Sequence, residues 1–282
     1  MKTSIETIEF HGIQALRLNG PGGASAVISL LGGQLLSWMT PDGRERLYLS
    51  EKAVFDGSQA IRGGVPVCFP QFANLGELPK HGLVRTRMWS LDTQRCGDDY
   101  ALVTLSLRDD ADSRALWPFP FALELTVMLE ADRIDLELCV QNTGATAFAF
   151  TAALHGYLRC VQVEDVSIEG LYGHDYRDAT RNNAVVRDTG TELTVDREID
   201  RVYRAVKRPQ WLRAGNLSLG IQQQGFTDVV IWNPWAEKCA ALADMPESDW
   251  RHMLCIEAAV ADTPVELTAG DEWYGRQTLV AI

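Results

Sequence analysis

The chain has 282 residues, an ordinary globular composition with 46% hydrophobic residues, and a formal net charge of −12. A length of this order allows two small domains or one large all-β domain, and the apolar content is ample for a core. The negative charge argues against a general nucleic-acid or anionic-membrane surface, because both need a basic face. We therefore expect no nucleic-acid partner and no membrane partner, and any anionic ligand would need cations gathered locally.

The N-terminal segment, residues 1–12, lacks the apolar stretch of a signal peptide, and no run is long enough to span a membrane. The six cysteines are scattered along the chain and form no C-x-x-C pair. This spacing is typical of reduced, buried thiols. We expect a cytoplasmic protein.

Period-two alternation of apolar residues dominates the chain from its first third onward. It runs through residues 25–38 and 100–109, and then through 121–129 and 134–140, which flank the turn-like "EADR". That pair predicts a long antiparallel hairpin. Alternation returns in residues 217–224, and a short helix is expected within 234–245. The glycine-rich residues 19–25 have neither a P-loop lysine nor a following helix, so they indicate a turn.

These elements predict an all-β fold, a large antiparallel β-sandwich with few short helices. We find no linker, low-complexity segment or internal repeat, so we expect a single domain over residues 1–282.

Alternation fails most clearly in residues 59–89, which contain Arg62, Lys80, His81 and Arg85. Loops of this kind on a rigid sheet commonly carry ligand contacts, and arginine suits phosphate or carboxylate groups. Arg62 precedes a Gly-Gly pair, which we expect to let the backbone approach a ligand closely. Either arginine, taken alone, can instead be paired with an acid on the surface.

Two His-Gly pairs, at His81 and His155, suggest that two imidazoles line one cavity. A lone histidine on an apolar face is more often a core residue than a catalyst. Neither H-x-H nor H-E-x-x-H spacing occurs, so the sequence predicts no metal site. Trp232 and Trp235 can pack on a sugar, although tryptophan is more often core or rim.

Glu257 lies inside the apolar run "HMLCIEAAV". As a strand, this run places Cys255 and Glu257 on one face and apolar residues on the other, so the carboxylate is expected to be buried. An unpaired buried carboxylate is costly, and it requires either compensation or a function. A core residue held in an ion pair would be the structural explanation.

The order of six segments resembles the glucose-6-phosphate 1-epimerase family, or D-hexose-6-phosphate mutarotases, of the galactose mutarotase-like superfamily. The segments are "IRGGVPVCFPQF", "PKHGLVR", "ALHGYLR", "EIDRVY", "WNPWAEKCAALADM" and "MLCIEAA", and the resemblance runs from about residue 28 to about residue 275. It implies a β-supersandwich with an open sugar-binding cleft. It also implies cofactor-free interconversion of the α and β anomers of a hexose 6-phosphate.

The resemblance implies a role for each matching residue. Glu257 corresponds to the general base and His155 to the general acid, while Arg62, Arg85 and Asp200 belong to the substrate site. Lys80 replaces a residue that is often glutamine in this family, and it either adds a cation beside the phosphate or weakens a sugar hydroxyl contact. We also include His81 among the substrate-binding residues.

The chemistry suits these residue types, since ring opening removes a proton from the C1 hydroxyl and delivers one to the ring oxygen. A carboxylate and an imidazolium on opposite sides of the ring would supply both transfers, each contributing about 10²–10⁴-fold. Burial raises a glutamate pKa toward the working range and makes it a stronger base. The expected partner is a small-molecule sugar phosphate, and we expect a monomer that needs no cofactor and no metal.

Two other functions remain open from the sequence. The first is an aldose 1-epimerase of free hexoses, which would use the same acid and base. The second is a non-catalytic sandwich that only binds a sugar phosphate, which would have no need for a matched acid and base.

Overall fold

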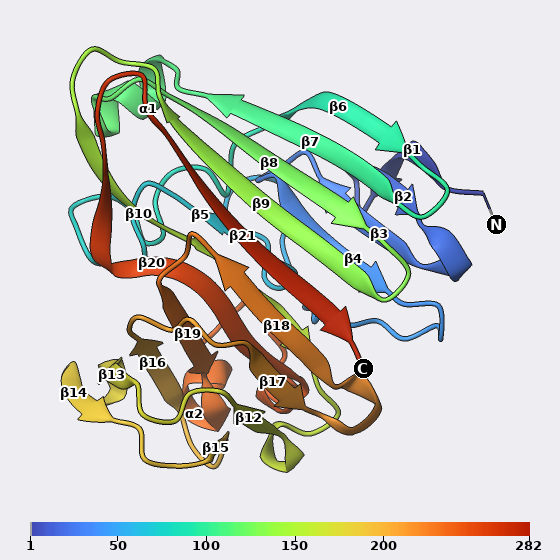
Figure 1. Cartoon of the computed structure of the whole chain (residues 1–282), viewed down its shortest axis with the longest axis vertical. Helices are drawn as coiled ribbons and strands as arrows, with labels where there is room; N and C mark the ends of the chain where they lie inside the picture. The colour runs from blue at the N-terminus through green and yellow to red at the C-terminus, as the bar shows by residue number, and fades with distance from the viewer. Residues whose placement is uncertain (1) are drawn as a thin grey trace.

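The protein is built from antiparallel sheets, in agreement with the alternation in its sequence. The computed structural model describes residues 2–282, and its strands form three sheets of four, eight and nine strands. Helices are few and short, so the expectation of an all-β fold is confirmed (Figure 1). None of the helices in residues 2–282 has the length and hydropathy needed to cross a membrane.

The nine-stranded sheet contains the long central hairpin and runs in the order β15-β12-β17-β18-β21-β9-β8-β7-β6. Its strands are β6 (Ser90–Cys96), β7 (Ala101–Arg108), β8 (Phe121–Leu129), β9 (Arg133–Asn142), β12 (Ser167–Glu169), β15 (Glu192–Thr194), β17 (Gln210–Arg213), β18 (Leu219–Gln224) and β21 (Glu272–Ala281). The strands β7, β8, β9 and β21 lie side by side as long ribbons across the upper half of Figure 1.

The eight-stranded sheet runs in the order β14-β13-β16-β19-β20-β10-β5, with β11 paired to β20 beside this path. Its strands are β5 (Val67–Cys68), β10 (Phe148–Leu154), β11 (Tyr157–Arg159), β13 (Asp175–Asp178), β14 (Ala184–Arg187), β16 (Ile199–Tyr203), β19 (Asp228–Asn233) and β20 (Met253–Leu267). The strand β20 continues into β21, so it connects this sheet directly to the nine-stranded one.

The N-terminal strands form a separate four-stranded sheet in the order β1-β2-β3-β4. Its strands are β1 (Ser4–Phe10), β2 (Ile13–Asn19), β3 (Ser25–Ser29) and β4 (Gln34–Met39). A 3₁₀ turn, η1 (Pro21–Gly23), lies between β2 and β3, as the glycine-rich segment indicates. Further 3₁₀ turns are η2 (Val163–Asp165), η3 (Ala179–Arg181), η4 (Gly215–Leu217) and η5 (Asp249–His252).

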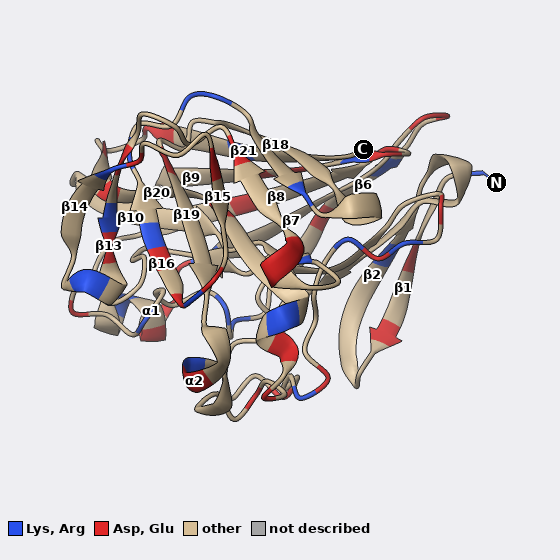
Figure 2. Cartoon of the chain, turned by 90° about the horizontal axis from the view of Figure 1, so that it is seen from below, with Lys and Arg blue, Asp and Glu red and all other residues tan. Residues whose placement is uncertain are grey.

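The structure has two α-helices, of which one was expected. Helix α2 (Trp235–Ala240) lies in the predicted segment and protrudes below the sheets in Figure 2. Helix α1 (Ala111–Leu116) was not predicted, because it buries no apolar residue and so shows no hydrophobic periodicity. A capping box starts it: Asp110 accepts a hydrogen bond from the Ser113 amide, and the Ser113 hydroxyl accepts one from the Asp110 amide.

The β8–β9 hairpin shows how the alternation becomes a core. The two strands pair from Phe121 with Asn142 to Leu129 with Ile134. Their predicted apolar faces are at most 1% exposed, and they pack into the large cluster between the sheets. All six cysteines are free thiols, and only Cys96 is exposed. Five of the six thiols are therefore buried, as the sequence indicates.

Candidate functional site

A cleft opens on one face of the eight-stranded sheet, and its volume is about 260 Å³. That is near the lower end of ordinary small-molecule sites, so the cleft suits a compact ligand. The structure places all seven candidate residues in its lining: Arg62, Lys80, His81, Arg85, His155, Asp200 and Glu257. The sequence selected these residues but did not give their arrangement, because they come from segments up to 195 residues apart.

Strand register explains why the sheet residues meet, because residues opposite one another on neighbouring strands share a face. One row crosses four strands and consists of Tyr157, Cys255, Trp232 and Asp200. In the next row, Val230 lies opposite Glu257. Both rows face the cleft, so the pleat of the central strands positions the side chains that line the cleft.

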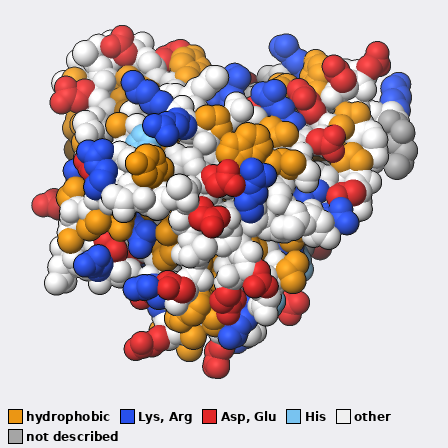
Figure 3. Space-filling view, turned by 60° about the horizontal axis from the view of Figure 1, so that its bottom comes forward, with side chains coloured by type: hydrophobic (Ala, Val, Ile, Leu, Met, Phe, Trp, Pro, Cys, Tyr) orange, Lys and Arg blue, Asp and Glu red, His pale blue; other side chains and the backbone are white. Residues whose placement is uncertain are grey.

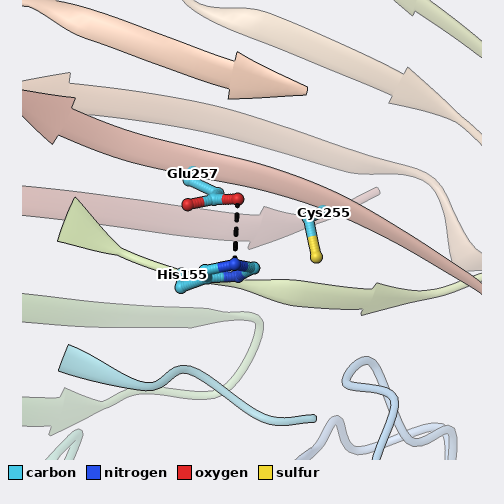
Figure 4. Close-up of side chains that lie close together, drawn as sticks. All are labelled: His155, Cys255 and Glu257. Atoms are coloured by element: carbon cyan, nitrogen blue, oxygen red, sulfur yellow. Dashed lines mark ion pairs between the residues drawn. The ribbon is translucent and has the colours of Figure 1, made fainter. Parts of the chain in front are cut away.

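His155 and Glu257 are the central pair of the cleft. The Nε2 atom of His155 lies 3.3 Å from Oε1 of Glu257, and the side chains are 10% and 1% exposed. Figure 4 shows Glu257 on one strand facing the ring of His155 on another. We expected the acid and the base to lie on opposite sides of the sugar ring. That expectation is wrong for this structure, because the two side chains are in contact.

Burial controls the ionisation of this pair. Desolvation raises the pKa of Glu257 well above its ordinary value, and the nearby Asp200 carboxylate raises it further. Desolvation also holds the pKa of His155 well below its ordinary value, with Arg85 and Arg62 lowering it further. Both shifts favour the neutral forms, so the contact of 3.3 Å is consistent with one proton held between the two side chains.

Each member of the pair has a buried atom left without a partner. These atoms are Nδ1 of His155 and Oε2 of Glu257. Tyr157 supports the imidazole from one side, with ring centroids 4.9 Å apart and an interplanar angle of 12°. The pair is therefore fixed in orientation and still has bonding capacity for a ligand.

His81 is a second imidazole in the cleft, and its ring centroid lies 5.1 Å from that of His155. Its Nδ1 accepts a hydrogen bond from the Ala73 amide at 3.3 Å and lies 3.2 Å from Sγ of Cys68. Burial and the neighbouring cationic groups hold the pKa of His81 far below its ordinary value. Because Nδ1 is an acceptor, the neutral ring carries its proton on Nε2 and can donate one hydrogen bond.

The turn at His81-Gly82 holds that imidazole in a strained backbone. His81 has a φ of +65°, which is uncommon for a residue other than glycine. Gly82 has a φ of +80°, and a Cβ there would lie 2.0 Å from the carbonyl oxygen of Phe69. Glycine is therefore required at this position by close backbone contact.

Arg62 is held by protein groups on both sides. Its Nε and Nη2 atoms each lie 3.1 Å from Oδ2 of Asp244, and its Nη1 donates to the Tyr157 hydroxyl at 2.9 Å. We expected the following Gly63-Gly64 pair to let the backbone approach a ligand, but neither glycine lines the cleft. A Cβ on Gly64 would lie 2.2 Å from the carbonyl oxygen of Leu35, so the glycines allow contact between backbones.

Lys80 and Arg85 differ from Arg62 in having no ion pair with a carboxylate anywhere in residues 2–282. Arg85 donates from Nη2 to the Lys80 carbonyl oxygen at 2.6 Å, and its buried Nε has no partner. Burial, together with the charge of Lys238, lowers the pKa of Lys80. Elsewhere, Lys and Arg are interspersed with Asp and Glu, as Figure 3 shows for one face. The cleft thus brings three cationic side chains together, beside the acidic side chains of Asp200, Asp244 and Glu257.

Asp200 lies on β16, opposite Trp232 of β19, and lines the same cleft. Burial raises its pKa, and Lys238 and Lys80 partly offset that effect. Two contributors to the site were missed from sequence: Asp244, which holds Arg62, and Tyr157, which contacts both Arg62 and His155. Both belong to segments that the resemblance marks. Trp232 lines the cleft, whereas Trp235 packs on Trp250.

Comparison with known proteins identifies the family. The model of the family described as aldose 1-epimerase matches residues 14–279. The chain belongs to the aldose 1-epimerase family. It is therefore an isomerase by family, and its fold agrees with that assignment.

Relatives of this family member include proteins from plants and bacteria. A protein of Cenchrus ciliaris named "Putative glucose-6-phosphate 1-epimerase" is 34% identical over 96% of this chain and 85% of its own length. A protein of Escherichia coli K12 with the same name is 31% identical over 86% of this chain and 82% of its own length. The crystal structure of a "putative mutarotase" from Salmonella typhimurium superposes with a TM-score of 0.90, at 26% identity over 98% of this chain and 92% of that one.

Proposed function

We propose that this family member interconverts the α and β anomers of hexose 6-phosphates, with glucose 6-phosphate as the reference substrate. The observation that carries the proposal is a buried acid–base pair in contact at 3.3 Å, in the same cleft as three cationic side chains. The names of the relatives support the same substrate class.

In the proposed reaction, Glu257 accepts the proton of the C1 hydroxyl while His155 donates a proton to the ring oxygen. The bond between C1 and the ring oxygen then breaks and gives the open-chain aldehyde. Both oxygens are attached to C1 in the closed ring, so adjacent acid and base groups can reach them together. After rotation about the C1–C2 bond, the reverse transfers close the ring on the other face.

The remaining candidates have supporting roles in this proposal. Arg62, Lys80 and Arg85 bind the phosphate, since a dianion requires several donors in a protein of net charge −12. Asp200 accepts a hydrogen bond from a sugar hydroxyl, and neutral His81 donates one. No step requires a metal or a cofactor.

The test is the anomerisation rate of α-D-glucose 6-phosphate, measured with a coupling dehydrogenase specific for the β anomer, with free glucose in parallel. The wild type should accelerate the phosphate sugar, and Glu257→Gln should lower that rate by about 10²–10⁴-fold. Glu266→Gln is the matched control, because Glu266 is an exposed carboxylate on the same strand.

Equal or greater acceleration of free glucose would replace the proposal with aldose 1-epimerase activity on free hexoses. Binding of the phosphate sugar without acceleration would support a non-catalytic binding sandwich. If Glu257→Gln does not change the rate, Glu257 is not the general base and its role is structural.

A further inference from the structure

A third donor atom lies beside the acid–base pair. One ring nitrogen of His155, the Sγ of Cys255 and one carboxylate oxygen of Glu257 all lie within 4.8 Å of one another. Figure 4 shows Cys255 and Glu257 projecting from one strand on the same side as His155. The three residues are buried, and the thiol has no role in the proposed proton transfers.

The sequence predicted no metal site because no H-x-H or H-E-x-x-H spacing occurs. That criterion does not apply to this cluster, whose residues come from two different segments of the chain. Cys255 and Glu257 are two residues apart on β20, so they share a face, while His155 comes from the end of β10 across the sheet. Strand pairing brings them together: Leu154, next to His155, lies opposite Ala258. Such a donor set has no linear signature to find.

The donors match the preferences of one class of ion. Zinc binds imidazole nitrogen, thiolate sulfur and carboxylate oxygen at about 2.0–2.3 Å in tetrahedral geometry, so its ligand atoms lie roughly 3–4 Å apart. The mixed nitrogen, sulfur and oxygen set does not suit magnesium or calcium, which take oxygen ligands. The unpartnered Oε2 of Glu257 is a second, independent indication that the buried pair can accept another bonding partner.

We propose that His155, Cys255 and Glu257 form an inhibitory site for Zn²⁺ and similar borderline transition-metal ions. Three protein ligands leave the fourth position of the metal open toward the cleft. Binding releases the thiol proton of Cys255 and the proton held between His155 and Glu257. The thiolate and carboxylate together neutralise the dication, which is necessary because Arg62 and Arg85 repel it.

Metal occupancy stops the proposed chemistry by using both of its proton-carrying groups. The lone pair of His155 and the carboxylate of Glu257 would be bound to the ion, so neither could exchange protons with a sugar. This inhibitory consequence rests on the proposed function, whereas metal binding itself does not. The two are separable by measuring binding and turnover independently.

The binding test uses Co²⁺ as a spectroscopic probe of the intact protein, because a thiolate ligand gives a sulfur-to-cobalt charge-transfer band in the near ultraviolet. We expect one equivalent of Co²⁺ to produce that band and one equivalent of Zn²⁺ to abolish it. Cys255→Ala should lose the band and weaken Zn²⁺ binding by about 100-fold, as expected for removing one of three ligands. Cys255→Ser is the second variant, since it keeps nearly the same volume if the alanine variant does not fold.

Two further variants serve as controls for other thiols. Cys96→Ser removes the exposed cysteine, and Cys239→Ala removes a buried one outside the cluster. Both should keep the band and the Zn²⁺ affinity of the wild type. Turnover is followed in parallel in zinc buffers, relative to the zinc-free rate of each variant, and half-inhibition should shift about 100-fold in the Cys255 variants.

The outcomes decide the proposal. No band in the wild type would overturn it, and so would a band that survives in both Cys255 variants. A band lost in Cys68→Ala but kept in the Cys255 variants would also overturn it, by assigning the metal to Cys68 and His81, whose atoms lie 3.2 Å apart. A protein with no mutarotase activity that still shows the Cys255-dependent band would sustain the metal site and reject only the proposed function.

Discussion

Replacing Arg85 by glutamine tests whether the cationic side of the cleft recognises phosphate. Arg85 is the most suitable of the three cations because no carboxylate pairs with it in residues 2–282, so its removal leaves no buried charge uncompensated. Arg62 is less suitable, since its loss would leave Asp244 unpaired. The Arg85→Gln change keeps a polar side chain of similar reach and removes the charge.

The size of the effect follows from the contacts available. A hydrogen bond to a charged group contributes about 1.5–3 kcal/mol, and every 1.4 kcal/mol or so corresponds to tenfold. Two unit charges roughly 5 Å apart interact by about 3 kcal/mol at an effective dielectric constant near 20, which agrees with that range. We therefore expect kcat/KM for α-D-glucose 6-phosphate to fall by about 10- to 100-fold, and that for free glucose to stay within about threefold.

The assay is steady-state anomerisation of both sugars, with Arg95→Gln as the matched control, because Arg95 is exposed and has no ion pair among the described residues. If Arg85 binds the phosphate group, inorganic phosphate should inhibit the wild type more strongly than Arg85→Gln. Equal losses for both sugars in Arg85→Gln would refute phosphate recognition by this side chain. An unchanged kcat/KM for the phosphate sugar would refute it as well.

Three other predictions follow from the geometry. Because burial raises the folded-state pKa of Glu257, the stability of the wild type relative to Glu257→Gln should fall as the pH rises above the ordinary glutamate value, measured by urea unfolding of both proteins between pH 4 and 9. Tyr157→Phe removes an acceptor from Arg62, so KM for the phosphate sugar should rise about tenfold in steady-state kinetics; an unchanged KM would contradict this. Gly82→Ala places a Cβ against the Phe69 carbonyl, and the free energy of unfolding should drop by about 1–3 kcal/mol or more; an unchanged midpoint would count against that contact.

Much of the fold could be predicted because alternation reports directly on a half-buried strand. The faces of the β8–β9 hairpin are buried as expected, and Glu257 lies in a strand with apolar neighbours. Helix α1 was not predicted because it buries no apolar residue, and its start depends on local capping by Asp110.

The sequence predicted which residues belong to the candidate site, but it did not predict how their side chains are arranged. Alternation breaks and the family resemblance selected seven residues that the cleft brings together. The contact between His155 and Glu257 depends on strand register, which no segment of the sequence specifies alone. Asp244 was missed for the same reason, because its partner Arg62 lies 182 residues away in the chain. Long-range pairing therefore decides the geometry that sequence patterns leave open.

The cations of the cleft also connect the proposed phosphate site to the acid–base pair. Arg85, Arg62 and Lys80 all lower the pKa of His155, which works against an imidazole that must hold a proton. A bound phosphate dianion would offset these charges and raise that pKa, so the acid would be ready mainly when a phosphorylated sugar occupies the cleft. A free hexose adds no negative charge, so the cations continue to lower the pKa of His155, which then holds its proton less well. On this reasoning the cleft selects phosphorylated sugars twice, once by attraction and once by controlling the acid. Arg85→Gln should consequently raise KM more than it lowers kcat, since it removes attraction for the phosphate and one of the charges that depress His155.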